Sequence, residues 1–269
     1  MELSRRLRVK PGAKVDLADI DPAGTHGFEK GRDLEAALAK NIARIDELQY
    51  LMYAEHRRAL LVVLQGIDAS GKDGTIRHVM TGFNPQGCRV TPFKAPTPEE
   101  LAHDFLWRIH HAVPGKGDVA IFNRSHYEDV LVVRVHELVP APVWKRRYDQ
   151  INDFERYLAE NDVVIVKFFL HISKDEQKRR LERRLEDSTR QWKVALSDFE
   201  ERKRWKDYQR AYEDAITRCN TQEAPWYVVP ADKKWFRNLA VSQVLVETLE
   251  ALDMHFPKPT VDLSRVKVE

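Results

Sequence analysis

The residues best suited to chemistry lie in one loop, 66–75, which reads Gly-Ile-Asp-Ala-Ser-Gly-Lys-Asp-Gly-Thr. An apolar run ends at Gly66, and Gly71 and Lys72 follow after four intervening residues. Glycines at this spacing let backbone N–H groups turn inward and the lysine adds a positive charge, which is typical of a loop that binds a chain of phosphates. Asp73 stands where such loops usually carry Ser or Thr, whose hydroxyl binds Mg²⁺. The pattern predicts phosphate binding without specifying ATP. The residues expected to contact phosphate are Gly66, Ala69, Ser70, Gly71, Lys72, Asp73, Gly74 and Thr75.

Asp68 lies inside this loop, where a carboxylate would repel phosphates unless a cation lay between them. We therefore predict that Asp68 is a ligand of Mg²⁺, directly or through water. The alternative is a loop carboxylate that bonds to its own backbone. Asp73 could assist the metal, or it could cap the helix that follows.

A second polar segment follows the apolar run 119–122 and begins with Asn123 and Arg124. Ligands of open α/β sheets collect at the carboxyl ends of strands, and an arginine there can bridge donor and acceptor phosphates with its planar fork. Asn123 stands where phosphate-binding proteins often place an Asp for the metal, and it brings an oxygen without a charge. Glu128 follows within the next turn, where its orientation toward or away from the site stays open. The alternative for Arg124 is an ordinary surface arginine.

A third segment, 178–193, carries seven basic residues against three acidic ones. On a helix, Arg180 and Arg184 lie one turn apart on the same face. Together with Lys193 they could close over phosphates as a lid, exclude water and neutralise charge. The alternative is a solvated helix on which acidic and basic side chains pair.

These three segments need a scaffold that brings them together. Apolar runs without alternation are typical of parallel strands buried on both faces, and they occur at 60–65, 88–91, 119–122, 163–170 and 226–229. Helical periodicity or start signals lie before or between them, with predicted helices at 33–58, 144–158 and 233–252 and capping boxes at Thr97, Ser173 and Ser197. Strands that alternate with helices predict a single α/β domain around a doubly wound parallel sheet. Residues 1–32 are expected to form an irregular arm.

Composition narrows the class of protein. The chain has 269 residues, 43% hydrophobic and 32% charged, with a net charge of +2, which predicts a globular core and gives no sign of nucleic-acid binding. It contains no stretch of about 18 apolar residues and no apolar signal core, so we expect a cytoplasmic protein that does not bind membranes. Two cysteines cannot build a disulfide framework or a zinc site.

With these segments in hand, the chain resembles the polyphosphate kinase 2 family. The matching motifs run in order from 66–74 and 122–127 through Arg180, Arg184 and Trp192-Lys193, and they continue with Trp205-x-x-Tyr208, Ala224-Pro-Trp226 and 231–234. The resemblance implies a three-layer P-loop kinase fold similar to thymidylate kinase, with a five-stranded parallel sheet, a helical lid at about 175–200 and an N-terminal extension. The implied segments are 1–58 for the arm and first helix, 59–255 for the kinase domain and 256–269 for the tail.

The resemblance also implies the reaction, which is Mg²⁺-dependent transfer of phosphoryl groups between inorganic polyphosphate and nucleotides; Mn²⁺ can replace Mg²⁺. By this resemblance Asp68 serves the metal, Lys72 and Arg124 act on the transferring phosphoryl group, and lid residues hold phosphate: Arg180, Arg184 and Lys193. Asn123 together with Glu128 is similar to the subgroup that accepts both nucleoside monophosphates and diphosphates, and both residues are expected to contact nucleotide with Arg124. Gly82, Phe83 and Asn84 are candidates for the nucleoside side, or else form a turn that ends a helix.

Two other functions stay open at this point. One is an ATP-dependent nucleoside or nucleotide kinase, and the other is a nucleotide-driven switch or anion-binding module without transferase activity. A homo-oligomer, either a dimer or a tetramer, is expected if the helix at 33–58 exposes an apolar face.

Overall fold

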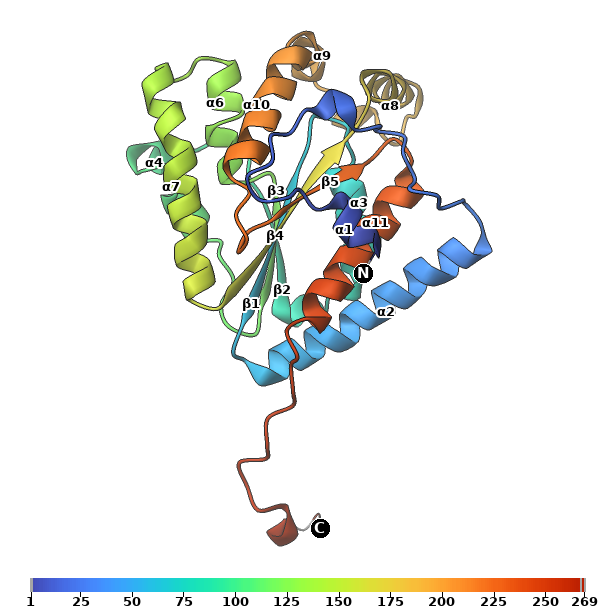
Figure 1. Cartoon of the computed structure of the whole chain (residues 1–269), viewed down its shortest axis with the longest axis vertical. Helices are drawn as coiled ribbons and strands as arrows, with labels where there is room; N and C mark the ends of the chain where they lie inside the picture. The colour runs from blue at the N-terminus through green and yellow to red at the C-terminus, as the bar shows by residue number, and fades with distance from the viewer. Residues whose placement is uncertain (1, 267, 269) are drawn as a thin grey trace.

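The five predicted strands form one parallel sheet in the computed structural model, which describes residues 2–266 and 268. The strand order is β2-β3-β1-β4-β5 (Figure 1). The strands are β1 (Ala59–Gln65), β2 (Cys88–Pro92), β3 (Val119–Asn123), β4 (Val163–His171) and β5 (Trp226–Pro230). Each coincides with one of the predicted apolar runs to within one residue at either end. The α/β class and the five-stranded parallel sheet are therefore confirmed.

The register of the central strands brings the predicted site segments together. Leu64 of β1 is paired with Asn123 of β3. Because both strands run in the same direction, the loop after β1 and the polar segment after β3 leave the sheet at the same edge. The lid follows β4, the other neighbour of β1, at this edge as well.

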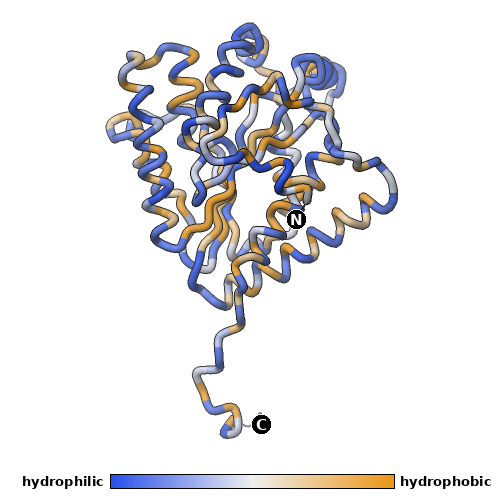
Figure 2. The backbone as a smooth tube through the Cα atoms, in the orientation of Figure 1, coloured by the Kyte–Doolittle hydropathy of each residue, from blue (hydrophilic) through white to orange (hydrophobic). Residues whose placement is uncertain are grey.

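Helices cover both faces of the sheet and give three layers. The two faces of β1 pack into different hydrophobic clusters, with Leu61 and Val63 in one and Leu60, Val62 and Leu64 in the other. The first cluster includes side chains of α7 (Ala141–Glu160) and α10 (Trp205–Arg218). The second includes side chains of α2 (Arg32–Glu55), α3 (Lys72–Val79) and α11 (Lys234–Glu250). Figure 2 shows the apolar strands between the more polar helices.

The lid consists of α8 (Lys174–Glu186) and α9 (Leu196–Lys203), at the top of Figure 1. Three further α-helices are short: α4 (Pro98–Ala102), α5 (Trp107–His110) and α6 (Val132–Val135). Thr97 forms the predicted capping box, and Ser173 caps α8 by accepting from Glu176 N–H. The prediction for Ser197 is wrong, because α9 begins one residue earlier and Ser197 lies in its first turn.

The N-terminal arm is more ordered than predicted. Helix α1 (Glu2–Leu7) packs against α11, and Arg8 then forms an antiparallel bridge with Tyr227 of β5. Polar and apolar residues are mixed in this segment, so its order comes from contacts with distant elements rather than from its own periodicity. The C-terminal segment extends away from the body of the molecule (Figure 1). Within the described residues, no helix combines the length and apolar character needed to cross a membrane.

Candidate active site

The phosphate-binding loop connects the carboxyl end of β1 to the first turn of α3. Gly66 and Gly71 have φ angles of 153° and 109°, which a residue with a Cβ adopts only under strain. A Cβ on Gly66 would also lie 2.9 Å from the carbonyl oxygen of Leu170 on β4. The first N–H groups of α3 lack acceptors within the helix, so its start provides donors and the positive end of the helix dipole. The backbone has the form that a phosphate-binding loop requires.

Lys72 begins α3 and reaches back across this loop. Its Nζ donates a hydrogen bond to the carbonyl oxygen of Gly66 at 2.6 Å, and its side chain is buried. Burial, followed by the nearby Arg124 guanidinium, lowers the pKa of Lys72 from its ordinary value of 10.5 to about 8. The ammonium therefore carries a charge at neutral pH that few water molecules screen.

We expect kcat/KM for the phosphate donor to fall as the pH rises through about 8, the pKa of Lys72. Protonated Lys72 attracts phosphate, and this form is lost above its pKa. The measurement is kcat/KM from about pH 6.5 to about pH 9.5 in the wild type and in Lys72→Arg, whose guanidinium stays charged over that range. The fall should be absent from the variant. An equal fall in both proteins would assign it to another group.

Arg124 lies at the carboxyl end of β3 between two carboxylates. Its Nη2 is 2.5 Å from Asp68 Oδ1, and its Nη1 is 3.1 Å from Glu128 Oε2. Its φ of 64° is left-handed, and its N–H donates to the carbonyl oxygen of Leu64 at 3.0 Å, so the end of β1 helps to hold it. Glu128, followed by Asp68, raises the pKa of Arg124 despite its burial. The structure therefore brings Asp68, Arg124 and Glu128 into one charged cluster.

Asp73 connects the loop to two other predicted residues. Asn123 Nδ2 donates to Asp73 Oδ1 at 2.9 Å, and Lys193 Nζ lies 3.3 Å from Asp73 Oδ2. Burial alone would raise the pKa of Asp73, but the Asn123 hydrogen bond and the Lys193 ammonium lower it. Asp73 therefore links the end of β3 to the lid, and Asn123 here contacts the first turn of α3.

Arg180, predicted to hold phosphate, gives its donors to protein groups in this structure. Its guanidinium is buried, and its Nε donates to Glu176 Oε1 at 2.8 Å. Its remaining N–H groups donate to four carbonyl oxygens, those of Ala69, Ser70, Ala231 and Asp232. All five donors are used. Arg180 therefore connects the phosphate-binding loop to the segment after β5 and holds the loop in place.

The other predicted lid arginine lies at the junction of the two lid helices. Arg184 Nη1 is 3.2 Å from Asp198 Oδ2 of α9. Burial, followed by the Asp68 carboxylate, raises the pKa of Asp198, which places this junction near the loop. Of the two arginines of α8 that were predicted to contact phosphate, Arg180 is buried and Arg184 is partly exposed.

Three cations of α8 and α11 have no acidic partner, and one of them, Arg237, lies against the loop at Gly71. We call Arg183, Lys234 and Arg237 the cation cluster. Within residues 2–266 and 268, no carboxylate lies within ion-pair distance of any of them. Burial, followed by the charges of neighbouring arginines that include Arg183 and Arg237, lowers the pKa of Lys234. Such an excess of positive charge attracts a polyanion.

The residues predicted for the nucleoside side lie elsewhere. Gly82 and Phe83 are buried against α2, where a Cβ on Gly82 would lie 2.7 Å from the carbonyl oxygen of Ile42. Asn84 accepts from Gln86 N–H in a turn after α3. Helix α3 separates this turn from the loop by about 12 Å, given the helical rise. Gly82 and Phe83 form the turn that ends α3, and nucleotide contacts at Gly82, Phe83 and Asn84 stay a prediction.

Gln65 is a site residue that the sequence analysis did not identify. Its Nε2 donates to Ser125 Oγ and to Glu128 Oε1, both at 3.1 Å, and its Oε1 accepts from the Tyr212 hydroxyl at 3.2 Å. Gln65 therefore holds the turn after β3 against the end of β1. The sequence signal that could have identified Gln65 is an amide side chain directly after six apolar residues.

A buried ionic network behind this turn was also missed. Lys167 of β4 and Glu155 of α7 are fully buried with Nζ 2.5 Å from Oε2. Lys167 also donates to the Tyr127 hydroxyl at 2.8 Å, and His126 Nε2 lies 3.1 Å from Glu155 Oε1. The network fixes His126 and Tyr127, two of the three residues between Arg124 and Glu128 in the turn. The sequence signal for this network is Lys167 inside an apolar strand. Its partner Glu155 could not be identified from the sequence, because it lies on another element.

A Mg²⁺ ion fits Asp68 as a partial site. Within the described residues, no group of three or more His, Cys, Asp or Glu side chains could hold a metal by itself. Mg²⁺ commonly uses one or two carboxylates and takes its other ligands from substrate phosphates and water. Asp68, within the loop, supplies a donor of that kind, with Arg124 as its present partner.

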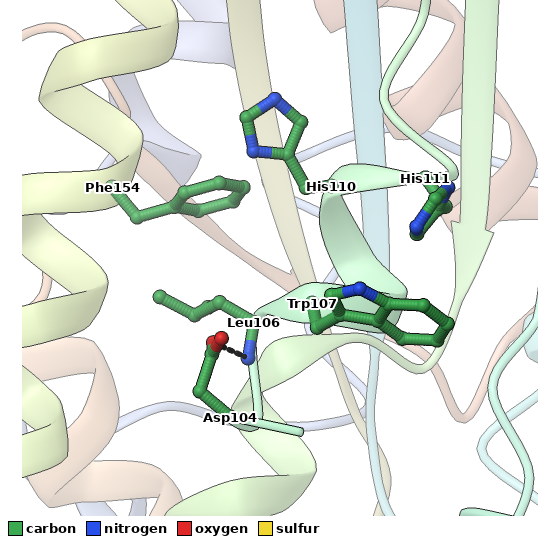
Figure 3. A pocket seen from close by; sticks show the side chains of 6 residues that line it. All are labelled: Asp104, Leu106, Trp107, His110, His111 and Phe154. Carbon is green, nitrogen blue, oxygen red and sulfur yellow. Dashed lines mark hydrogen bonds between the residues drawn. The ribbon is translucent and has the colours of Figure 1, made fainter. Parts of the chain in front are cut away.

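A hollow of about 320 Å³ lies apart from these residues, between the α4–α5 segment and α7 (Figure 3). Its walls include Trp107, His110, His111 and Phe154. His103 stacks on Trp107 with ring centroids 4.2 Å apart, and His110 meets Phe154 edge to face. These histidines pack against aromatic rings, and none of the lining residues belongs to the phosphate site.

Comparisons with known proteins agree with this geometry. The sequence profile of the family described as Polyphosphate kinase 2 matches residues 29–257. An AMP/ADP-polyphosphate phosphotransferase of Meiothermus ruber is 52% identical over 98% of this chain and 100% of the relative. An ADP-polyphosphate phosphotransferase of Rhodopseudomonas palustris is 44% identical over 96% of this chain and 93% of the relative.

A crystal structure shares the fold as well as the sequence. Polyphosphate Kinase 2 from Arthrobacter aurescens TC1 superposes with a TM-score of 0.93 and 45% identity, covering 97% of this chain and 94% of the other. The sequence match, the P-loop kinase sheet and the phosphate-binding loop agree with one another. The chain belongs to the polyphosphate kinase 2 family.

Proposed function

We propose that this protein transfers phosphoryl groups between inorganic polyphosphate and nucleotides, with AMP and ADP as acceptors and in either direction. Membership of the polyphosphate kinase 2 family supports the reaction. The names of relatives that align with nearly the whole chain support both acceptors.

The observation that carries the proposal is the positive charge of Lys72 together with the cation cluster of α8 and α11, which reaches the loop at Arg237. Lys72 places one charge at the loop, and the cluster adds further cations without acidic partners. A polyphosphate chain carries negative charge on each phosphate, and the exposed members of the cluster, Arg183 and Lys234, offer it cations in addition to Lys72. A nucleoside would instead need a mainly apolar pocket with a few polar groups. The donor side therefore suits polyphosphate better than ATP.

The residues suggest how transfer proceeds. Loop N–H groups and Lys72 hold the terminal phosphoryl group, and a phosphate oxygen of the acceptor nucleotide attacks its phosphorus in line. The new P–O bond forms as the P–O bond to the remaining chain breaks, and the shortened chain leaves with the electron pair. Lys72 and Arg124 stabilise charge on the equatorial oxygens. The attacking phosphate is already anionic, so the step needs no strong general base.

We propose that Asp68 holds Mg²⁺, or Mn²⁺ in its place, directly or through water. When bound, the ion would neutralise phosphate charge and orient the chain. Asp68 now pairs with Arg124. The arriving phosphates offer Arg124 new acceptors, which leaves the carboxylate available to the ion.

The test is incubation of the protein with Mg²⁺ and polyphosphate together with AMP, ADP or GDP in turn, while nucleotide products are followed. ADP and ATP are the products expected from AMP and ADP, in the absence of added ATP as donor. A matched reaction contains ATP and a nucleoside but no polyphosphate, and we expect no product from it. Product only in the matched reaction would contradict the proposal and favour a nucleoside kinase.

We also propose a cytoplasmic homo-oligomer, for which one surface provides support. Tyr50 and Tyr53 on the outer face of α2 are 63% and 48% exposed, and Phe256 packs on Tyr50 while remaining exposed itself. Exposed aromatic side chains that lie together are typical of protein interfaces.

A further inference from the structure

Arg237 of α11 lies directly behind the phosphate-binding loop. Its side chain is 1% exposed. A Cβ built on Gly71 would lie 1.9 Å from Arg237 Nη1, and one built on Gly74 would lie 3.1 Å from Nη2. The guanidinium therefore fills the space that a side chain at either position would need.

The charge of Arg237 is not compensated within the protein. Its Nε and Nη2 both donate to Asn238 Oδ1, at 3.2 and 2.8 Å, and this neutral amide is its hydrogen-bond partner. Among the residues that the structure describes, no carboxylate comes within ion-pair distance of it. Its charged neighbour is Arg180, and burial followed by the Arg180 charge lowers the pKa of Arg237 to about 9. Two guanidinium groups of like charge thus lie against one loop.

Arg180, which is buried, and Arg124, which is partly buried, both have acidic partners. Arg124 lies between Asp68 and Glu128, and Arg180 contacts Glu176. A buried charge without a counter-ion destabilises a folded protein, because the desolvation cost is not recovered. Arg237 is therefore a destabilising feature of the ligand-free protein, and its position behind the loop indicates which ligand would offset it.

We propose that the phosphate chain bound at the loop is the counter-ion of Arg237, which makes Arg237 an electrostatic positioning residue for phosphate binding. The attraction passes through the loop, where water is scarce and charges interact strongly. The ligand-free protein loses stability to this charge and recovers it when phosphate binds. The identity of the ligand rests on the proposed function, whereas the uncompensated charge does not.

The test compares the wild type with Arg237→Met by two measurements. The first is the melting temperature without ligand, and the second is the dissociation constant for inorganic tripolyphosphate with Mg²⁺, measured by calorimetry. We expect the variant to melt at the same temperature as the wild type or higher, and to bind tripolyphosphate about tenfold more weakly. A residue with a merely structural role would lower the melting temperature instead. Arg237→Lys, which keeps the charge, should bind tripolyphosphate within about threefold of the wild type.

Arg134→Met is the matched control. Arg134 is paired with Asp214 at 2.6 Å and bonded to the Tyr148 hydroxyl, so its charge is compensated. Its loss should lower the melting temperature and leave tripolyphosphate binding unchanged.

The outcomes separate this inference from the proposed function. A lower melting temperature in Arg237→Met, including failure to fold, overturns the inference, and so does unchanged tripolyphosphate binding in that variant. Arg237→Gln removes the charge while keeping a polar group beside Asn238, and its melting temperature and binding must change as those of Arg237→Met do. If the wild type binds tripolyphosphate but transfers no phosphoryl group, the proposed function fails while this inference stands.

Discussion

Replacing Lys72 by methionine is expected to lower kcat with polyphosphate and ADP by about 10³-fold. Lys72 places a buried positive charge at the loop, where charge accumulates on the transferring phosphoryl group. Methionine has a similar length and fills the same space without the charge. Because the ammonium is desolvated in the folded protein, its removal should leave the melting temperature within a few degrees of the wild type.

Steady-state rates and thermal melting of the same preparations check this prediction. Lys116→Met is the matched control, since Lys116 is exposed and pairs with Asp162 at the amino ends of β3 and β4, at the opposite edge of the sheet. Its kcat should equal that of the wild type. The kcat of Asp68→Ala should fall by a factor similar to that of Lys72→Met, because the substitution removes the predicted metal ligand and a partner of Arg124. Near wild-type kcat in Lys72→Met or in Asp68→Ala would contradict the role assigned to that residue.

Replacing Lys167 by methionine is expected to reduce the free energy of unfolding by about 3–5 kcal/mol, the usual cost of stranding one charge of a buried pair. Lys167 and Glu155 are both fully buried. Without the ammonium, the carboxylate keeps hydrogen bonds from His126 and Tyr127 but loses its opposite charge. Because those two residues form the turn that carries Arg124, activity should fall as well.

Urea denaturation of the single and double variants measures this effect. In the double variant Lys167→Met with Glu155→Leu, no buried carboxylate is left without a cation. We expect the double variant to be more stable than Lys167→Met by about 1–3 kcal/mol. If the double variant loses the sum of the two single losses, the residues do not interact and the argument fails.

The strands and the phosphate-binding loop could be predicted from the sequence because their signals are local. A parallel strand buried on both faces needs a continuous apolar run, and the run 163–170 gives β4 to within one residue. The loop needs glycine at positions 66 and 71 because its backbone has positive φ angles there, so these glycines are a local signal of the loop. Local signals did not indicate α1 within the otherwise irregular arm, and the capping-box pattern at Ser197 gave the wrong start for α9.

The sequence by itself determined which chemical groups are present and at which edge of the sheet they gather. It could not determine how each group is compensated, because the partners of a buried charge come from elements far away in the chain. Arg180 and Arg237 show this difference. Arg180 gives every donor to protein acceptors, whereas Arg237 has one neutral partner among the residues that the structure describes. Only the tertiary structure showed that the predicted lid arginine supports the loop, while an arginine that no motif had indicated keeps an uncompensated charge beside it.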